Sequence, residues 1–183
     1  PEAWHAMREG LGYWIGKVDA IDPGTLNQQD RLTRDVLMSI FSGEQDKSIC
    51  FNEQWSLSPR SNAFSSLLRL PEDHPVRSVE DGNNLVERYK AIPMVIANDI
   101  ANMRLGMEAG RVPTQESTRR TIDLITNALE QPEAEWALLA PTQEAHTTWS
   151  TAELEYFRST LTHVTKASVW PAFETYRDFI QEE

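Results

Sequence analysis

The sequence has few of the residues that usually mark a catalytic or metal site. It contains four histidines, each followed by a residue other than Glu, so no His-Glu pair exists: His5, His74, His146 and His163. The zinc-peptidase pattern of two histidines on one helix turn is therefore absent from this chain. Cys50 is the only cysteine, which excludes an intrachain disulfide and a thiolate zinc site. We predict no catalytic, cofactor-binding or metal-binding residues in this chain.

Long apolar runs and signal-peptide patterns are also missing. The net charge is −11, and the acidic excess is concentrated in residues 114–183, which hold 5 basic and 12 acidic residues. An acidic surface repels phosphate backbones and anionic lipids, so we predict no nucleic-acid partner and no membrane insertion by this segment. A hydrophobic content of 40% and six tryptophans exclude a disordered chain.

The apolar residues that are present recur at helical spacing. Trp4, Met7, Leu11, Trp14 and Val18 follow one another at intervals of three and four residues, as on one face of a helix. Similar stripes predict helices over residues 27–46, 78–107, 115–129 and 150–180. No run with the two-residue period of a strand occurs. We therefore predict an all-α fold of five or six mostly antiparallel helices.

Local signals fix several helix ends. Ser78 with Asp81, and Ser150 with Glu153, have the spacing of capping boxes. Proline within the predicted helices should kink them or separate two helices, at positions 93 and 171.

Two segments have the composition of long irregular loops, at about residues 52–77 and 132–150. The first holds many serines and prolines, with one short helical turn predicted at 64–70. The second carries Trp136 and Trp149. We treat residues 1–183 as a single helical domain, and its abrupt ends suggest a fragment of a longer protein.

A resemblance adds to this description. Two stretches carry it: Leu85-x-x-Arg88-Tyr89-x-x-Ile92-Pro93 with the following Ile100-x-x-Met103-Arg104-x-Gly106-x-x-x-Gly110-x-Val112-Pro113-Thr114, and Val169-Trp170-Pro171-Ala172-Phe173-x-x-Tyr176-x-x-Phe179-Ile180. In order and spacing they resemble the N-terminal helical half of the bacterial domain-of-unknown-function 885 family. The resemblance covers most of residues 20–183.

The resemblance implies a zinc-metallopeptidase-like parent protein with a long-helix fold similar to the angiotensin-converting-enzyme group. It implies a bacterial, exported protein, in the periplasm or held as a lipoprotein. The family's metal-binding segment lies downstream of the part matched here, so zinc is expected in the full-length parent and no zinc ligand is carried over. Arg88, Arg104 and Arg111 are candidates for facing a peptide carboxylate.

Two functions follow as hypotheses. In the first, the chain is a non-catalytic N-terminal portion that forms a wall or lid of a substrate channel, with the missing C-terminal half of the parent and a peptide substrate as partners. This hypothesis predicts an exposed apolar surface. In the second, the chain is a stand-alone helical binding module for a peptide or small molecule, with a closed core and a pocket between the two loops.

Overall fold

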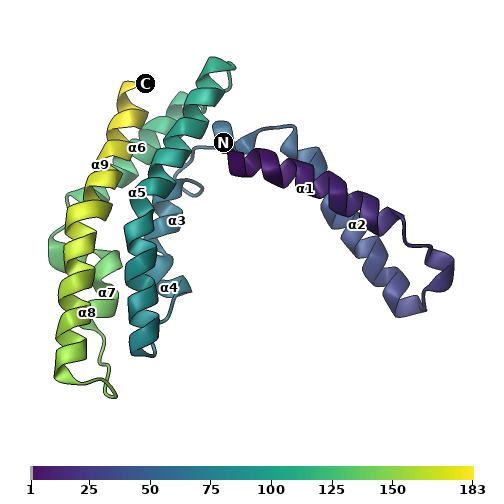
Figure 1. Ribbon diagram of the computed structural model, residues 1–183. Coiled ribbons are helices and arrows are strands. Elements are labelled where there is room, and N and C mark those ends of the chain that lie inside the picture. Colours follow the sequence, from purple (N-terminus) through teal and green to yellow (C-terminus); the bar gives the residue numbers. More distant parts are fainter. Residues whose placement is uncertain (1) are drawn as a thin grey trace. The chain divides into compact units, whose positions relative to one another are not determined.

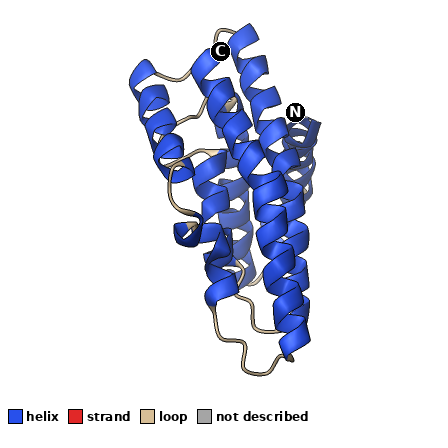
Figure 2. Cartoon of the chain, turned by 90° about the vertical axis from the view of Figure 1, so that its left-hand side faces the viewer, coloured by secondary structure: helices blue, strands red, loops and turns tan. Residues whose placement is uncertain are grey.

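The computed structural model describes residues 2–183 and is built from helices, turns and loops (Figure 1). No strand occurs among these residues, as the view in Figure 2 also shows, and the predicted all-α fold is confirmed. The chain divides into two compact units, Pro1–Glu53 and Gln54–Glu183. We call them the hairpin unit and the bundle unit and describe each by itself.

The hairpin unit consists of two helices, α1 (Glu2–Asp19) and α2 (Gln28–Ser48). Between them, the Asp22 side chain accepts a hydrogen bond from the Gly24 amide at 2.8 Å, and Asn27 caps α2 by accepting one from Asp30 at 2.9 Å. The helices pack against each other along their length. Val18 is the single apolar side chain of residues 2–53 that is buried, so this unit has almost no core of its own.

The bundle unit is built around a long helix, α5 (Val79–Glu108). The other long elements are α6 (Gln115–Leu129), α8 (Thr151–Val164) and α9 (Trp170–Glu182). Short helices lie between them: α3 (Ala63–Leu68), α4 (Leu70–Asp73) and α7 (Ala140–Gln143). Both predicted capping boxes are present, at the starts of α5 and α8.

The two prolines of the helical stripes are accommodated differently. Pro93 lies inside α5, which continues through it. Before Pro171, one π-helical turn (Thr165–Val169) joins α8 to α9. Proline has no amide hydrogen to donate to the preceding turn of a helix. The π-helical turn, which is wider than an α-helical one, changes the hydrogen-bond pattern just before Pro171. The two helices therefore form a nearly continuous column beside α5 (Figure 1).

This column runs parallel to α5, because the same ends of the two elements meet. Residues at their C-terminal ends, Arg104 and Glu183, form an ion pair, and Gly82 near the start of α5 lies against Phe157 of α8. The intervening α6 runs back antiparallel to α5 and packs against α9. A parallel pair is possible here because a long connection, residues 109–150, returns the chain to the starting end.

The core of the bundle unit also draws on the segments predicted as irregular. Phe64 of α3 is fully buried against Phe173 of α9, with ring centroids 4.7 Å apart at 76°. The hydroxyl of buried Tyr89 donates to the Leu138 carbonyl at 2.8 Å. Both segments therefore fold onto the long helices rather than extending away from them.

Candidate functional site

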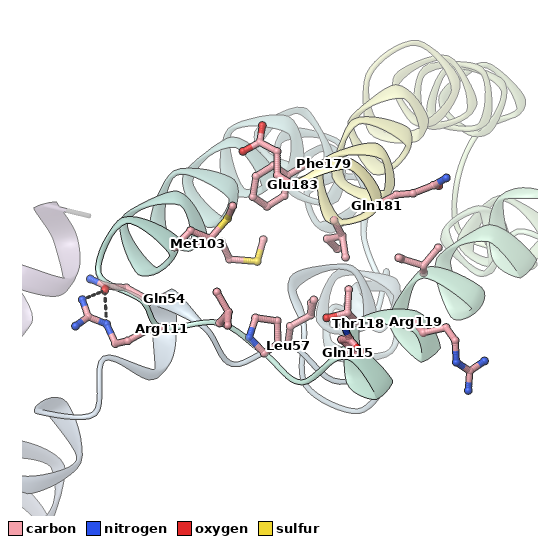
Figure 3. Close-up of a pocket in the computed structure, with 15 residues that line it drawn as sticks. Gln54, Leu57, Met103, Arg111, Gln115, Thr118, Arg119, Phe179, Gln181 and Glu183 are labelled. Carbon is pink, nitrogen blue, oxygen red and sulfur yellow. Dashed lines mark hydrogen bonds between the residues drawn. The ribbon is translucent and has the colours of Figure 1, made fainter.

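One hollow of the bundle unit lies between α5, α6 and α9 (Figure 3). We call it the α5–α6–α9 cavity; its volume is about 470 Å³. Its apolar lining consists of Leu57, Met103, Met107, Val112, Pro113, Ile122, Phe179 and Ile180. Polar side chains at its edge include Gln54, Arg111, Thr118, Arg119 and Glu183. A hollow of this size and composition suits an apolar group with polar neighbours.

The turn between α5 and α6 shapes one side of the cavity. Gly110 takes the left-handed conformation, with φ of 70°, and ends α5 in a way that favours glycine. The Arg111 amide then donates to the Gly106 carbonyl at 2.8 Å. Thr114 caps α6 by accepting from the Ser117 amide at 3.3 Å. The turn thus places Arg111 and the start of α6 at the cavity edge.

Arg111 fastens this turn to the segment that begins the bundle unit. Its Nε donates to the Gln54 side-chain oxygen at 3.0 Å, and its Nη2 donates to the same atom (Figure 3). Gln54 is buried, and its carbonyl passes so close to Gly106 that a side chain there would meet it. This close approach forms the wall of the cavity opposite α9.

Arg104 lies at the same end of the unit. Its guanidinium donates to both carboxylate oxygens of Glu183, at 3.1 and 2.6 Å, and lies 5.2 Å from the centre of the Phe179 ring. The Arg104 hydrogen bonds hold the pKa of Glu183 below its ordinary value. Phe179 and Glu183 line the α5–α6–α9 cavity, whereas Arg104 lines a second hollow, of about 610 Å³, between α5 and α9.

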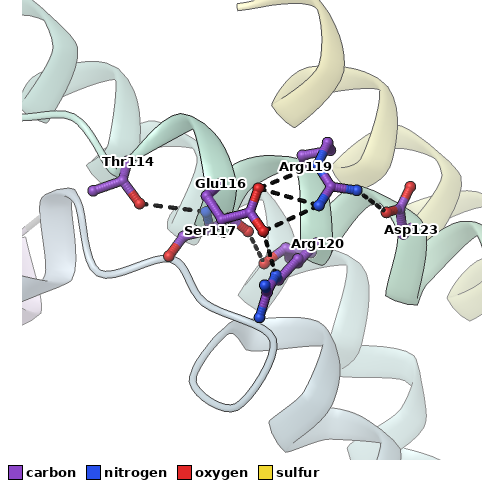
Figure 4. A network of polar contacts seen from close by, with 7 residues as sticks. Thr114, Glu116, Ser117, Arg119, Arg120 and Asp123 are labelled. Atoms are coloured by element: carbon purple, nitrogen blue, oxygen red, sulfur yellow. Dashed lines mark hydrogen bonds and ion pairs between the residues drawn. The ribbon is translucent and has the colours of Figure 1, made fainter.

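A network of charges covers the first turns of α6 (Figure 4). Glu116 accepts from Arg120 at 2.6 Å and from Arg119 at 3.1 Å, and Arg119 also donates to Asp123 at 3.1 Å. Hydrogen bonds from Arg120 and Arg119 lower the pKa of Glu116. All four side chains are exposed, so the network contributes little to stability, but it fixes the position of Arg119 at the cavity edge.

The three arginines proposed from the sequence do not gather in one place. Arg104 and Arg111 lie at the cavity end of the unit. Arg88 lies on α5 about 24 Å from Arg104 along the helix axis, toward the N-terminus of the helix. There it lines a shallow polar hollow with His74, whose Nε2 lies 3.0 Å from the Asp81 carbonyl.

One polar pair inside the bundle unit was not predicted as a site. Asp99 of α5 is half-buried, and its carboxylate accepts from the fully buried Tyr176 hydroxyl of α9 at 2.8 Å. Burial raises the pKa of Asp99, and the Tyr176 hydrogen bond partly offsets this. Burial, followed by the Asp99 charge, raises the pKa of Tyr176. The sequence signal was a carboxylate within the apolar stripe Ile92, Ile96, Met103 of α5.

The Asp99 pair predicts a pH-dependent stability. The pKa of Asp99 is higher in the folded chain than in the unfolded one. The contribution of Asp99 to the free energy of unfolding is therefore fully present below the unfolded pKa and is lost as pH rises through the folded pKa. We expect Asp99→Asn to lose no stability in this way as pH rises, because the asparagine amide oxygen still accepts from Tyr176 but carries no charge. The variant should melt above the wild type at neutral pH, and the difference should close in acid.

Melting temperatures across about pH 3 to 8 provide the measurement. Asp99→Ala is the companion variant, because it removes the acceptor of Tyr176 and should be destabilised at every pH. Parallel pH profiles for the wild type and Asp99→Asn would contradict this account.

The donor set of the chain does not fit the zinc that the resemblance implies. Zinc sites in proteins need three or four nitrogen, sulfur or oxygen ligands held close together. Among residues 2–183, no group of three His, Cys, Asp or Glu side chains could hold a metal ion. Within the same residues, none of the helices combines the length and apolarity needed to cross a bilayer.

Comparison with known proteins gives one match. The model of the family described as "Bacterial protein of unknown function (DUF885)" matches residues 1–183. No curated protein and no solved structure matches the chain. The family match covers the whole sequence but supplies no description of a reaction.

Proposed function

The chain belongs to the DUF885 family of bacterial proteins of unknown function, and we propose that it is a non-catalytic helical portion of a metallopeptidase-like protein. In this proposal the bundle unit forms one wall of a substrate channel. The single observation that supports it best is the α5–α6–α9 cavity, which offers an apolar surface bordered by charged groups.

The lining suits the apolar side chains of a peptide. At about 470 Å³ the cavity is within the range of small-ligand pockets and exceeds the volume of one large side chain. Met103 and Met107 are unbranched and polarisable, so they adjust to different apolar groups. A wall of this kind would accept varied residues rather than a single one.

The edge suits the polar parts of a peptide. Arg111 and Arg119 place guanidinium groups at the cavity. Guanidinium groups bind carboxylates and backbone carbonyls through charge-assisted hydrogen bonds. Of the arginines proposed from the sequence, Arg111 therefore remains a candidate for this role, whereas Arg104 and Arg88 line other hollows.

In this proposal, zinc would be bound by another part of a longer parent protein. The residues that would hold it are not among those described here. The role we assign to this chain is to bind and orient a peptide.

Filling the cavity tests the proposal. Thr118→Trp places a large ring into the cavity from α6 and should weaken binding of the dipeptide N-acetyl-Phe-Leu at least ~10-fold, measured by calorimetric titration. Thr147→Trp, at an exposed position outside the cavity, is the matched control and should leave the affinity unchanged. Equal affinities for the two variants, or no binding to the wild type, would contradict the assignment.

A stand-alone binding module is the second candidate. It is favoured by the fact that every residue lining the cavity comes from the bundle unit, so this site is complete within residues 54–183. The first of the two loop segments contributes Gln54 and Leu57, whereas the second contributes nothing to the lining. In a longer parent protein, loss of peptide turnover in Thr118→Trp would support the channel wall, and unchanged turnover would support the module.

A further inference from the structure

The hairpin unit exposes far more apolar surface than it buries. Ten large apolar side chains of residues 2–53 are exposed: Trp4, Met7, Tyr13, Trp14, Ile21, Leu32, Val36, Leu37, Ile40 and Ile49. Val18 alone is buried. Soluble proteins rarely leave apolar patches of this extent uncovered unless another molecule binds there.

Part of this surface forms a regular stripe on α2. Leu32, Val36 and Ile40 are four residues apart and so lie one above the other on one face of the helix. Their side chains are 58%, 48% and 53% exposed. Such spacing is the pattern by which one helix packs along another.

Acidic residues border the stripe on both sides. By the 3.6-residue period, Asp35 and Asp46 lie along one side of it together with Arg31, Asp30 lies on the other side, and Glu44 follows Ile40 at the end of the row. The hairpin unit has nine acidic and five basic residues.

The five cations of the unit are already engaged within it. Arg8 pairs with Glu53, Arg34 with Asp19 and Asp35, and Lys47 with Glu44. Arg31 donates to the Leu26 carbonyl, and Lys17 lies over the Tyr13 ring. Asp35 and Glu44 therefore already have cationic partners, whereas no ion pair within residues 2–53 involves Asp30 or Asp46, and the unit as a whole keeps four more acidic than basic residues.

We propose that the stripe Leu32–Val36–Ile40 is a docking site for an amphipathic helix whose apolar face is flanked by Lys and Arg. The apolar residues would supply the buried area, and the acidic borders would select the charge of the partner and its register. A second copy of the hairpin unit fits less well, because its own stripe is bordered by acids and like charges would face one another. This inference concerns the hairpin unit and does not depend on the cavity of the bundle unit.

The experiment uses the full chain and a synthetic helical peptide of about 18 residues with leucines at intervals of three and four and lysines beside them. A matched peptide carries glutamates in place of the lysines. Fluorescence anisotropy at low salt should show binding of the lysine peptide and at least ~10-fold weaker binding of the glutamate peptide. Added salt should weaken the first complex, and less so in the variant with Asp30→Asn and Asp46→Asn.

Two substitutions locate the complex. Ile40→Asp should weaken binding of the lysine peptide at least ~10-fold, because it places a charge within the stripe. Met94→Asp, at a similarly exposed apolar position of α5 in the bundle unit, should leave it unchanged. Both positions are exposed, so neither variant should unfold the chain, which circular dichroism checks.

Several results would overturn the proposal. Equal binding of the two peptides, binding that ignores Ile40→Asp, or no binding at all would each do so. A dimer of the free chain that Ile40→Asp dissociates would identify a second copy as the occupant. The last control is a Cys50→Ser, Ile40→Cys variant measured without peptide. If its introduced thiol did not react, the stripe would already be covered by the chain itself.

Discussion

Gly106→Ala is expected to lower the free energy of unfolding of the bundle unit by about 3 kcal/mol or more. A Cβ atom at this position would lie only 2.1 Å from the Gln54 carbonyl oxygen and 3.0 Å from that of Arg111. Both obstacles are backbone atoms, so the whole segment around Gln54 must move to make room. The melting temperature of the bundle unit should fall by about 10 °C.

Glycines in the hairpin unit provide the control. Gly10 and Gly16 lie within α1 with open space where a Cβ would be. Alanine there should stabilise the helix by roughly 0.5–1 kcal/mol, because it reduces the freedom of the unfolded chain. If Gly106→Ala had the same small stabilising effect, the close approach of Gln54 to α5 would be wrong, and with it one wall of the cavity.

Phe173→Ala and Phe64→Ala are each expected to cost about 3–5 kcal/mol, the range for deleting a buried phenylalanine ring. Both side chains are fully buried and meet edge to face. Because they contact each other, the double variant should lose about 1 kcal/mol less than the sum of the single losses. Urea unfolding of the four proteins measures this coupling.

The Phe64 variant carries the more informative result. If it cost under about 1 kcal/mol, residues 63–68 would not belong to the core. The apolar residues around Leu57 would then lack the support that holds them at the cavity.

Helix ends and the inward face of α5 were predictable because they depend on neighbouring residues. The capping boxes at Ser78 and Ser150 need only a hydroxyl and a carboxylate three residues apart, and both formed. Within the predicted helix 78–107, Ile96, Ile100 and Met103 recur at helical spacing, and all three are buried. Local chemistry thus determined most of the helical pattern.

Features that depend on distant contacts were harder to predict. Pro93 was expected to start or kink a helix, yet α5 continues through it, packed against α8, α9 and α3. Phe64 stands in a stretch of serines and prolines, and its partner Phe173 is more than a hundred residues away. Packing over such separations leaves no mark in local periodicity.

The residues of the candidate site were hard to predict for the same reason. Met103 and Met107 read as ordinary core residues in the sequence, and only the arrangement of α6 and α9 makes them cavity walls. Arg104 and Arg111 were singled out with Arg88 from a motif, but separation along α5 divides them. Gln54 gave no signal, because its role comes from its contact with Arg111 across the unit.

Methyl NMR of the five methionines, during titration with N-acetyl-Phe-Leu, shows directly whether the α5–α6–α9 cavity binds a peptide. Met103 and Met107 line the cavity, whereas Met7, Met38 and Met94 lie elsewhere in the chain. We expect the Met103 and Met107 methyl signals to shift with saturation while the other three stay in place. Shifts confined to Met7, Met38 or Met94, or no shift of any methyl, would contradict the assignment of the α5–α6–α9 cavity as the peptide-binding wall.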